Sequence, residues 1–209
     1  MKTLVDEVQG RLRSAARAVR ALASDRRGVA AVEFAFIAPV LLSLYFVTME
    51  VSQAIETNRK VSRVGSMVAD LVTQQSSEVP KDELEAIMKI GSVILQPYNR
   101  SEPTITVTAI YLTDENNPDA EVQWSRKMTG TSFGEGPAKD TITSVPDTLK
   151  IRNTFLIRVT SELDYEPVIT WSAKKEAALG FAAAFDGIGM KETYYLRPRM
   201  TERIECKGC

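Results

Sequence analysis

A single carboxylate lies at the start of a long apolar segment. Glu33 is the fifth residue of the stretch 29–49, in which Tyr45 is the only other ionisable residue. About 20 predominantly apolar residues are enough for a helix to cross a bilayer. A charge inside the bilayer costs free energy unless it reaches the surface or meets a partner. We therefore expect Glu33 either to lie at the level of the lipid headgroups or to have a functional partner.

Two cysteines form the second group that could do chemistry. Cys206 and Cys209 give the pattern Cys-Lys-Gly-Cys at the C-terminus. In an oxidising compartment such close cysteines favour a small disulfide loop, in which Gly208 relieves the tight turn. Free or intermolecular thiols and redox catalysis are the alternatives, although a thioredoxin-like site needs further chain after the second cysteine. Zinc would need two more ligands, and the sequence offers no histidine or third cysteine.

The composition excludes several classes of function. The sequence has no histidine, which removes the usual general base and a common metal ligand. It also contains no carboxylate pair of recognisable spacing and no glycine-rich phosphate loop, so we expect no enzyme activity, cofactor or metal. Residues 1–28 carry a net charge of +4, and the remainder carries −5. An acidic body lacks the basic footprint of a nucleic-acid-binding protein.

The charge distribution predicts how the chain crosses the membrane. The basic leader 1–28 is expected to stay in the cytoplasm, residues 29–49 to span the inner membrane once, and the body to lie in the periplasm of a Gram-negative cell. No small-residue signal-peptidase site follows the apolar run, so we expect the span to be retained. Pro39 should bend the helix near Ala35.

The stretch around the apolar run resembles a known N-terminal signature. Residues 26–65 begin "RRGVAAVEFAFIAPVLLSLYF" and are similar to the TadE-like and TadG-like proteins of the tight-adherence (Flp) pilus system. The matching features are Gly28, Glu33, Phe34, Ala35 and Pro39. The family pattern implies that a prepilin peptidase cuts between Gly28 and Val29. Glu33 would then be the fifth residue of the mature chain, where a neighbouring subunit's free amine can neutralise it.

The resemblance implies a minor pseudopilin that acts in pilus biogenesis and surface adhesion. Its implied partners are the prepilin peptidase, other Tad minor pseudopilins, the major pilin and the inner-membrane platform proteins, and its implied destinations include the extracellular pilus. One alternative is an uncleaved single-pass periplasmic adhesin or adaptor, in which Glu33 merely snorkels to the headgroups. A thiol oxidoreductase that uses Cys206 and Cys209 is a third hypothesis.

Residue periodicity predicts an α+β, pilin-like fold, with a long N-terminal helix packed on an antiparallel sheet. The helix should run from about 29 to 73, with residues 50–75 as its periplasmic continuation, and residues 76–209 should form the folded domain. A short helix should follow Pro80 and end or be interrupted at Gly91. Strands are expected near 104–113, 121–129 and 153–165, with an exposed loop at 130–150. The alanines of residues 172–189 favour a short helix, and the alternative is a small apolar loop tip that packs against the membrane or a partner. Residues 190–205 favour a final strand in which Met200 alternates with Arg199.

Overall fold

The computed structural model describes Val19, residues 27–167 and residues 188–209. The leader 1–28 therefore lies almost wholly outside the described residues, as does the helix expected over 172–189. The chain divides into two compact units, Met1–Met49 and Glu50–Cys209. Each unit is considered by itself below.

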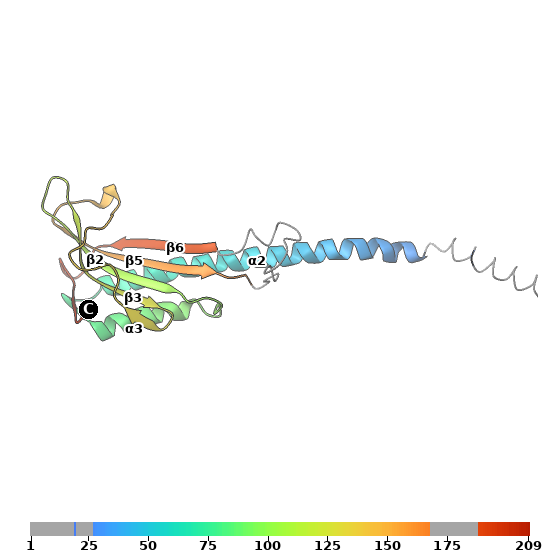
Figure 1. Cartoon of the computed structure of the whole chain (residues 1–209), viewed down its shortest axis with the longest axis horizontal. Helices are drawn as coiled ribbons and strands as arrows, with labels where there is room; N and C mark the ends of the chain where they lie inside the picture. The colour runs from blue at the N-terminus through green and yellow to red at the C-terminus, as the bar shows by residue number, and fades with distance from the viewer. Residues whose placement is uncertain (1–18, 20–26, 168–187) are drawn as a thin grey trace, which may run out of the picture. The chain divides into compact units, whose positions relative to one another are not determined.

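Helix α2 (Arg27–Thr73) contributes to both units (Figure 1). Its bounds agree with the predicted helix to within two residues. The helix continues through Pro39, and the bend expected there stays a prediction. The stretch Gly28–Thr73 is the one helix among the described residues that is long and apolar enough to cross a membrane.

The second unit contains a five-stranded antiparallel sheet in the order β4-β3-β2-β5-β6, with α2 and α3 on one side (Figure 1). The predicted α+β fold, with a long helix on an antiparallel sheet, is confirmed. The bounds of the remaining elements are β1 Glu78–Pro80, α3 Lys81–Ile94, β2 Thr104–Leu112, β3 Ala120–Thr129, β4 Ser132–Gly134, η1 Asp147–Leu149, β5 Thr154–Tyr165, β6 Ile188–Leu196 and β7 Glu205–Lys207.

The hydrophobic core lies between the helices and the inner face of the sheet. Alternation along the strands sends one set of side chains inward, including Val107 of β2 and Val159 of β5, which are fully buried. The apolar stripe of α2 that faces them includes Val61, Val64, Val68 and Val72. Burial of these two matched faces holds the second unit together.

Two glycines allow α2 to approach the sheet closely and α3 to approach α2 closely. A Cβ atom at Gly65 of α2 would lie 2.8 Å from the Ser161 hydroxyl oxygen and from the Tyr194 ring. A Cβ atom at Gly91 would lie 2.8 Å from a methyl group of Val68. The expectation that Gly91 ends or interrupts the second helix is wrong, because α3 runs through it to Ile94. Close packing against α2 explains this glycine.

The structure corrects two further expectations about the second unit and adds one pair of strands. The stretch 130–150 is not only an exposed loop, because it contains β4, η1 and the buried Val145. The last long strand ends at Leu196, and Met200 is 75% exposed. A parallel pair formed by β1 and β7 was not predicted. Both strands have only three residues, too few for a visible alternation.

A buried polar contact joins α2 to the end of β5. The Tyr165 hydroxyl donates to Glu50 Oε1 at 2.5 Å, and both side chains are buried. Tyr98 stacks on Tyr165 with 5.6 Å between ring centroids, and the Arg100 guanidinium lies 4.7 Å from the Tyr98 ring centre. Burial, together with the hydrogen bond to Glu50, raises the pKa of Tyr165 above its ordinary value. The phenol is therefore protonated at neutral pH and remains a donor.

We predict that Tyr165→Phe lowers the free energy of unfolding by about 1.5–3 kcal/mol near neutral pH, because a buried carboxylate loses a donor. The raised folded-state pKa makes this contribution complete below the unfolded-state pKa, and it is lost as the pH rises through the folded-state pKa. Thermal unfolding of the full chain in detergent measures the effect. Tyr195→Phe is the control, because Tyr195 is only half-buried. Equal stability of the two variants would contradict the assignment.

Candidate assembly site

The first unit exposes apolar side chains around the whole helix. Residues 28–48 are exposed apart from the half-buried Ala38. Phe34 is 69% exposed and Phe36 is 75% exposed. A helix that is apolar on all sides requires a lipid or protein environment. This segment is therefore a surface that something outside the described chain must cover.

Within this apolar surface, Glu33 is the polar group that stands out. The hydroxyls of Ser43 and Thr48 donate to the carbonyl oxygens of Val40 and Leu44, at 2.8 Å each, so the helix itself satisfies them. The Glu33 carboxylate is exposed and forms no hydrogen bond or ion pair with any residue that the structure describes. Among the described residues, therefore, nothing neutralises this charge.

Gly28 has no packing role that the structure reveals. A Cβ atom added to it would meet nothing within 4 Å, and its φ lies outside the left-handed range that favours glycine. In contrast, Gly65 and Gly91 are each required by close contacts. Folding of the described chain therefore does not explain why position 28 is glycine. A residue that another protein recognises would have this property, because its identity is set by that protein and not by the fold.

The predicted processing and assembly residues lie together on the first helical turns. Gly28, Val29, Glu33 and Phe34 all belong to α2, and all four side-chain positions are exposed. Pro39 follows them in the same helix and is also exposed. Within the first unit, each of these positions is therefore open to contact with another molecule, such as a peptidase or a neighbouring helix.

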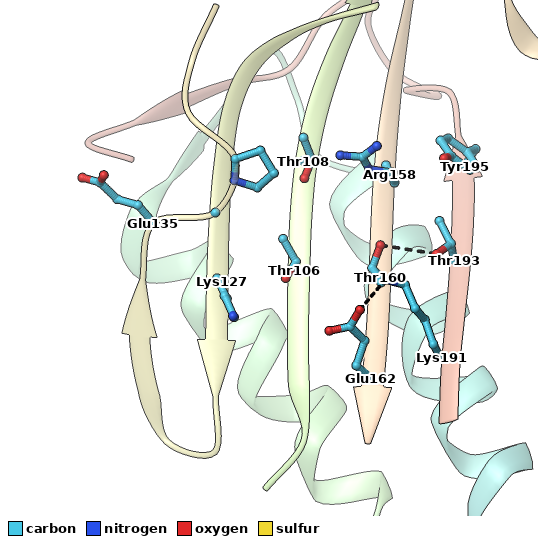
Figure 2. A pocket seen from close by; sticks show the side chains of 12 residues that line it. Thr106, Thr108, Lys127, Glu135, Arg158, Thr160, Glu162, Lys191, Thr193 and Tyr195 are labelled. Carbon is cyan, nitrogen blue, oxygen red and sulfur yellow. Dashed lines mark hydrogen bonds and ion pairs between the residues drawn. The ribbon is translucent and has the colours of Figure 1, made fainter. Parts of the chain in front are cut away.

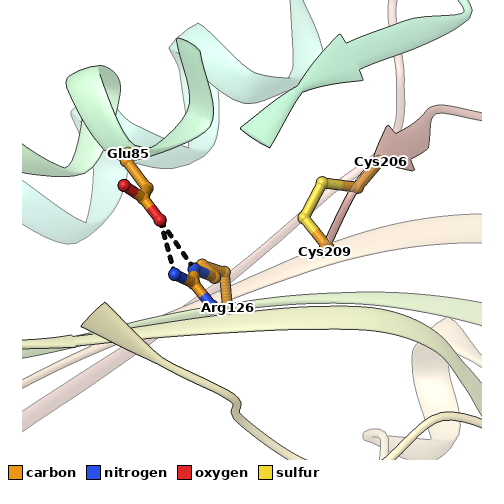
Figure 3. A network of polar contacts seen from close by, with 4 residues as sticks. All are labelled: Glu85, Arg126, Cys206 and Cys209. Carbon is orange, nitrogen blue, oxygen red and sulfur yellow. Dashed lines mark hydrogen bonds and ion pairs between the residues drawn. A yellow bond between two sulfur atoms is a disulfide. The ribbon is translucent and has the colours of Figure 1, made fainter. Parts of the chain in front are cut away.

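Cys206 and Cys209 belong to the second unit and form a disulfide (Figure 3). Cys206 lies on β7 opposite Val79 of β1 and packs partly against the core. Gly208, between the cysteines, has a φ of +85°, which a glycine adopts without strain. The bond closes the C-terminal loop where β7 pairs with β1.

A buried ion pair lies close to the same region. Arg126 of β3 donates from Nε to Glu85 Oε1 of α3 at 3.0 Å, and a second guanidinium nitrogen donates to the same oxygen (Figure 3). Both side chains are mostly buried, and the Arg126 guanidinium lies 5.8 Å from the Phe133 ring centre. The pair fixes α3 on the sheet. Sequence reasoning missed it because the partners lie on elements whose packing was not predicted.

The C-terminal segment holds the end of α2. The Arg199 guanidinium forms a 2.5 Å ion pair with Asp70. The backbone N–H of Arg199 donates to the Thr73 carbonyl oxygen at 3.0 Å. This contact satisfies one of the carbonyl groups that a helix end leaves open. Trp124 Nε1 donates to the Ile204 carbonyl oxygen at 2.7 Å. In the described part of the chain, no cluster of acidic or sulfur ligands could hold a metal ion.

We predict that replacing both cysteines, with Cys206→Ser and Cys209→Ser, lowers the free energy of unfolding by about 2 kcal/mol, because the closed loop is short. Thermal unfolding in detergent measures the difference. Reductant should lower the melting temperature of the wild-type chain and leave the double variant unchanged. Identical stability of oxidised and reduced wild-type chain would contradict a stabilising role for the bond.

The chain was compared with known proteins. No curated protein and no solved structure matches it. Residues 28–70 match the family model described as TadE-like protein. The matched stretch begins at Gly28, includes Glu33, Phe34 and Pro39, and ends within the part of α2 that packs on the sheet. The resemblance predicted from the sequence is confirmed: the chain carries a TadE-like segment at residues 28–70, which associates it with the Tad pilus machinery.

Proposed function

We propose that this chain is a minor pseudopilin of a tight-adherence pilus, a structural assembly component without catalytic activity. It would be anchored in the inner membrane by residues 29–49, with residues 1–28 in the cytoplasm and the second unit in the periplasm. Processing by a prepilin peptidase would release it for contact with other minor pseudopilins, the major pilin and the platform proteins. From there it would act in pilus biogenesis and surface adhesion.

The observation that carries this proposal is the exposed Glu33 carboxylate within the TadE-like apolar helix. The charge has no partner among the described residues, and it lies five positions after a glycine that packing does not require. Cleavage after Gly28 would create an amine at Val29. In a helix bundle, the amine of one subunit and the carboxylate of the next would neutralise each other. Both unexplained residues then serve one purpose.

The first test concerns processing. We predict that the mature protein isolated from cells that express the pilus genes begins at Val29, and that Gly28→Leu leaves the leader attached. Intact-mass spectrometry of the purified chain reads the N-terminus directly. Val29→Ala is the control, because it alters the adjacent position while it keeps the glycine. A wild-type chain of full length would instead favour an uncleaved periplasmic adhesin or adaptor.

The second test concerns the charge. We predict that Glu33→Gln leaves membrane insertion intact and reduces surface pili by about tenfold or more, because each inter-subunit amine loses its carboxylate partner. Membrane fractionation measures insertion, and shear-released pili measure assembly. Glu56→Gln is the matched control, since Glu56 is an exposed acid on the same helix that pairs with Lys60. Normal piliation of the Glu33→Gln strain would show that the carboxylate has no pairing role.

A further inference from the structure

The face of the sheet that turns away from the helices carries a groove. Its volume is about 600 Å³, within the range typical of small-molecule sites. Thr106 and Thr108 of β2, Thr160 of β5 and Thr193 of β6 form its floor, and Figure 2 shows their side chains across neighbouring strands. The register aligns Lys127, Thr106, Thr160 and Thr193 in one row across four strands. The floor is therefore rich in threonine side chains.

A loop gives this groove a wall. Residues 135–137 lie against β3, where the Ser125 hydroxyl donates to the Pro137 carbonyl oxygen at 2.7 Å. A Cβ atom at Gly136 would lie 2.7 Å from the Ser125 hydroxyl oxygen, so the loop touches the sheet. A solvated polar face is common in antiparallel sheets. This face differs because part of the chain is held over it.

Two positive charges in the groove are not neutralised. Lys191 forms a 2.6 Å ion pair with Glu162. In contrast, Lys127 and Arg158 have no carboxylate within ion-pair distance among the described residues, and Arg158 donates only to the neutral Thr143 hydroxyl and Ser144 carbonyl oxygens. Figure 2 shows the Glu135 side chain pointing away from the floor. The groove is therefore positive, although the chain beyond residue 28 carries −5.

The complementary charge occurs elsewhere on the same unit. The loop 113–119 between β2 and β3 contains Asp114, Glu115 and Asp119 and no basic residue. All three acids are exposed, and the nearest ion pair is a 3.9 Å contact from Asp114 to Arg152. Two acids thus remain without an ion pair among the described residues.

We propose that the acidic loop 113–119 of one copy docks into the groove of a second copy, with Glu115 and Asp119 facing Lys127 and Arg158. Charge complementarity between two surfaces favours this occupant and steers the encounter. Because the loop and the groove are different surfaces of one chain, contacts of this kind can join successive copies head to tail. The inference goes beyond the proposed function, and it depends on neither cleavage nor membrane insertion.

Sedimentation of the full chain in detergent tests this contact. We expect self-association that weakens between about 0.1 M and about 1 M salt, as the Debye length falls from about 10 Å to about 3 Å. The groove variant Lys127→Glu/Arg158→Glu and the loop variant Glu115→Lys/Asp119→Lys should each weaken it by about tenfold or more. A chain with all four changes should regain association, because both charges are exchanged.

Controls separate the contact from general effects. Arg59→Glu/Arg63→Glu makes the same change of charge on the exposed face of α2 and should leave association unchanged. The loop variant changes only the exposed residues Glu115 and Asp119, so a loss of association in this variant is not explained by misfolding. Any of three results would overturn the proposal. The wild-type chain could stay monomeric, its association could be insensitive to salt and to both charge reversals, or the four-change chain could fail to regain association. Binding of inorganic phosphate in the groove without self-association would also overturn it.

Discussion

The central constraint on this protein is a charge that its own described fold does not neutralise. Glu33 lies in a helix whose surface is apolar and exposed, and no described residue pairs with it. The hydroxyl groups further along the same segment are satisfied by the helix itself. In lipid, an unpaired carboxylate is unfavourable unless another molecule supplies a cation. The described part of the first unit thus leaves this charge without a partner, which agrees with a component that works in an assembly.

In the second unit, by contrast, the buried polar groups are paired within the fold. Glu50 is buried against Tyr165, Glu85 is paired with Arg126, and Asp70 is paired with Arg199. No buried polar side-chain atom of the described residues lacks a hydrogen-bond partner. Each of these contacts connects a helix to the sheet or to the C-terminal segment. The folded unit is internally satisfied, so the groups left open on it, such as those of the sheet groove, stand out as contact surfaces.

The sequence predicted the long elements and missed what depends on their packing. Alternation identified β2 and β5, and a helical stripe identified α2, because each pattern repeats several times. The strands β1 and β7 have three residues each, too few to show a repeating pattern. Gly91 was expected to end a helix because its contact with Val68 is a tertiary contact, which the local sequence does not reveal. Glu50 and Tyr165 are 115 positions apart. For the candidate site the sequence identified Gly28 and Glu33, but the positive groove needed the register of four strands.

Zero-length carbodiimide coupling of purified pili tests the central claim most directly, since it adds no spacer and joins an amine to a carboxylate only where the two groups are within bonding reach of each other. The account predicts a cross-linked peptide in which the α-amine of a chain that begins at Val29, or of a neighbouring pilus subunit, is bonded to the Glu33 carboxylate. Recovery of Glu33 only in unlinked peptides, from chains that retain residues 1–28, would contradict it.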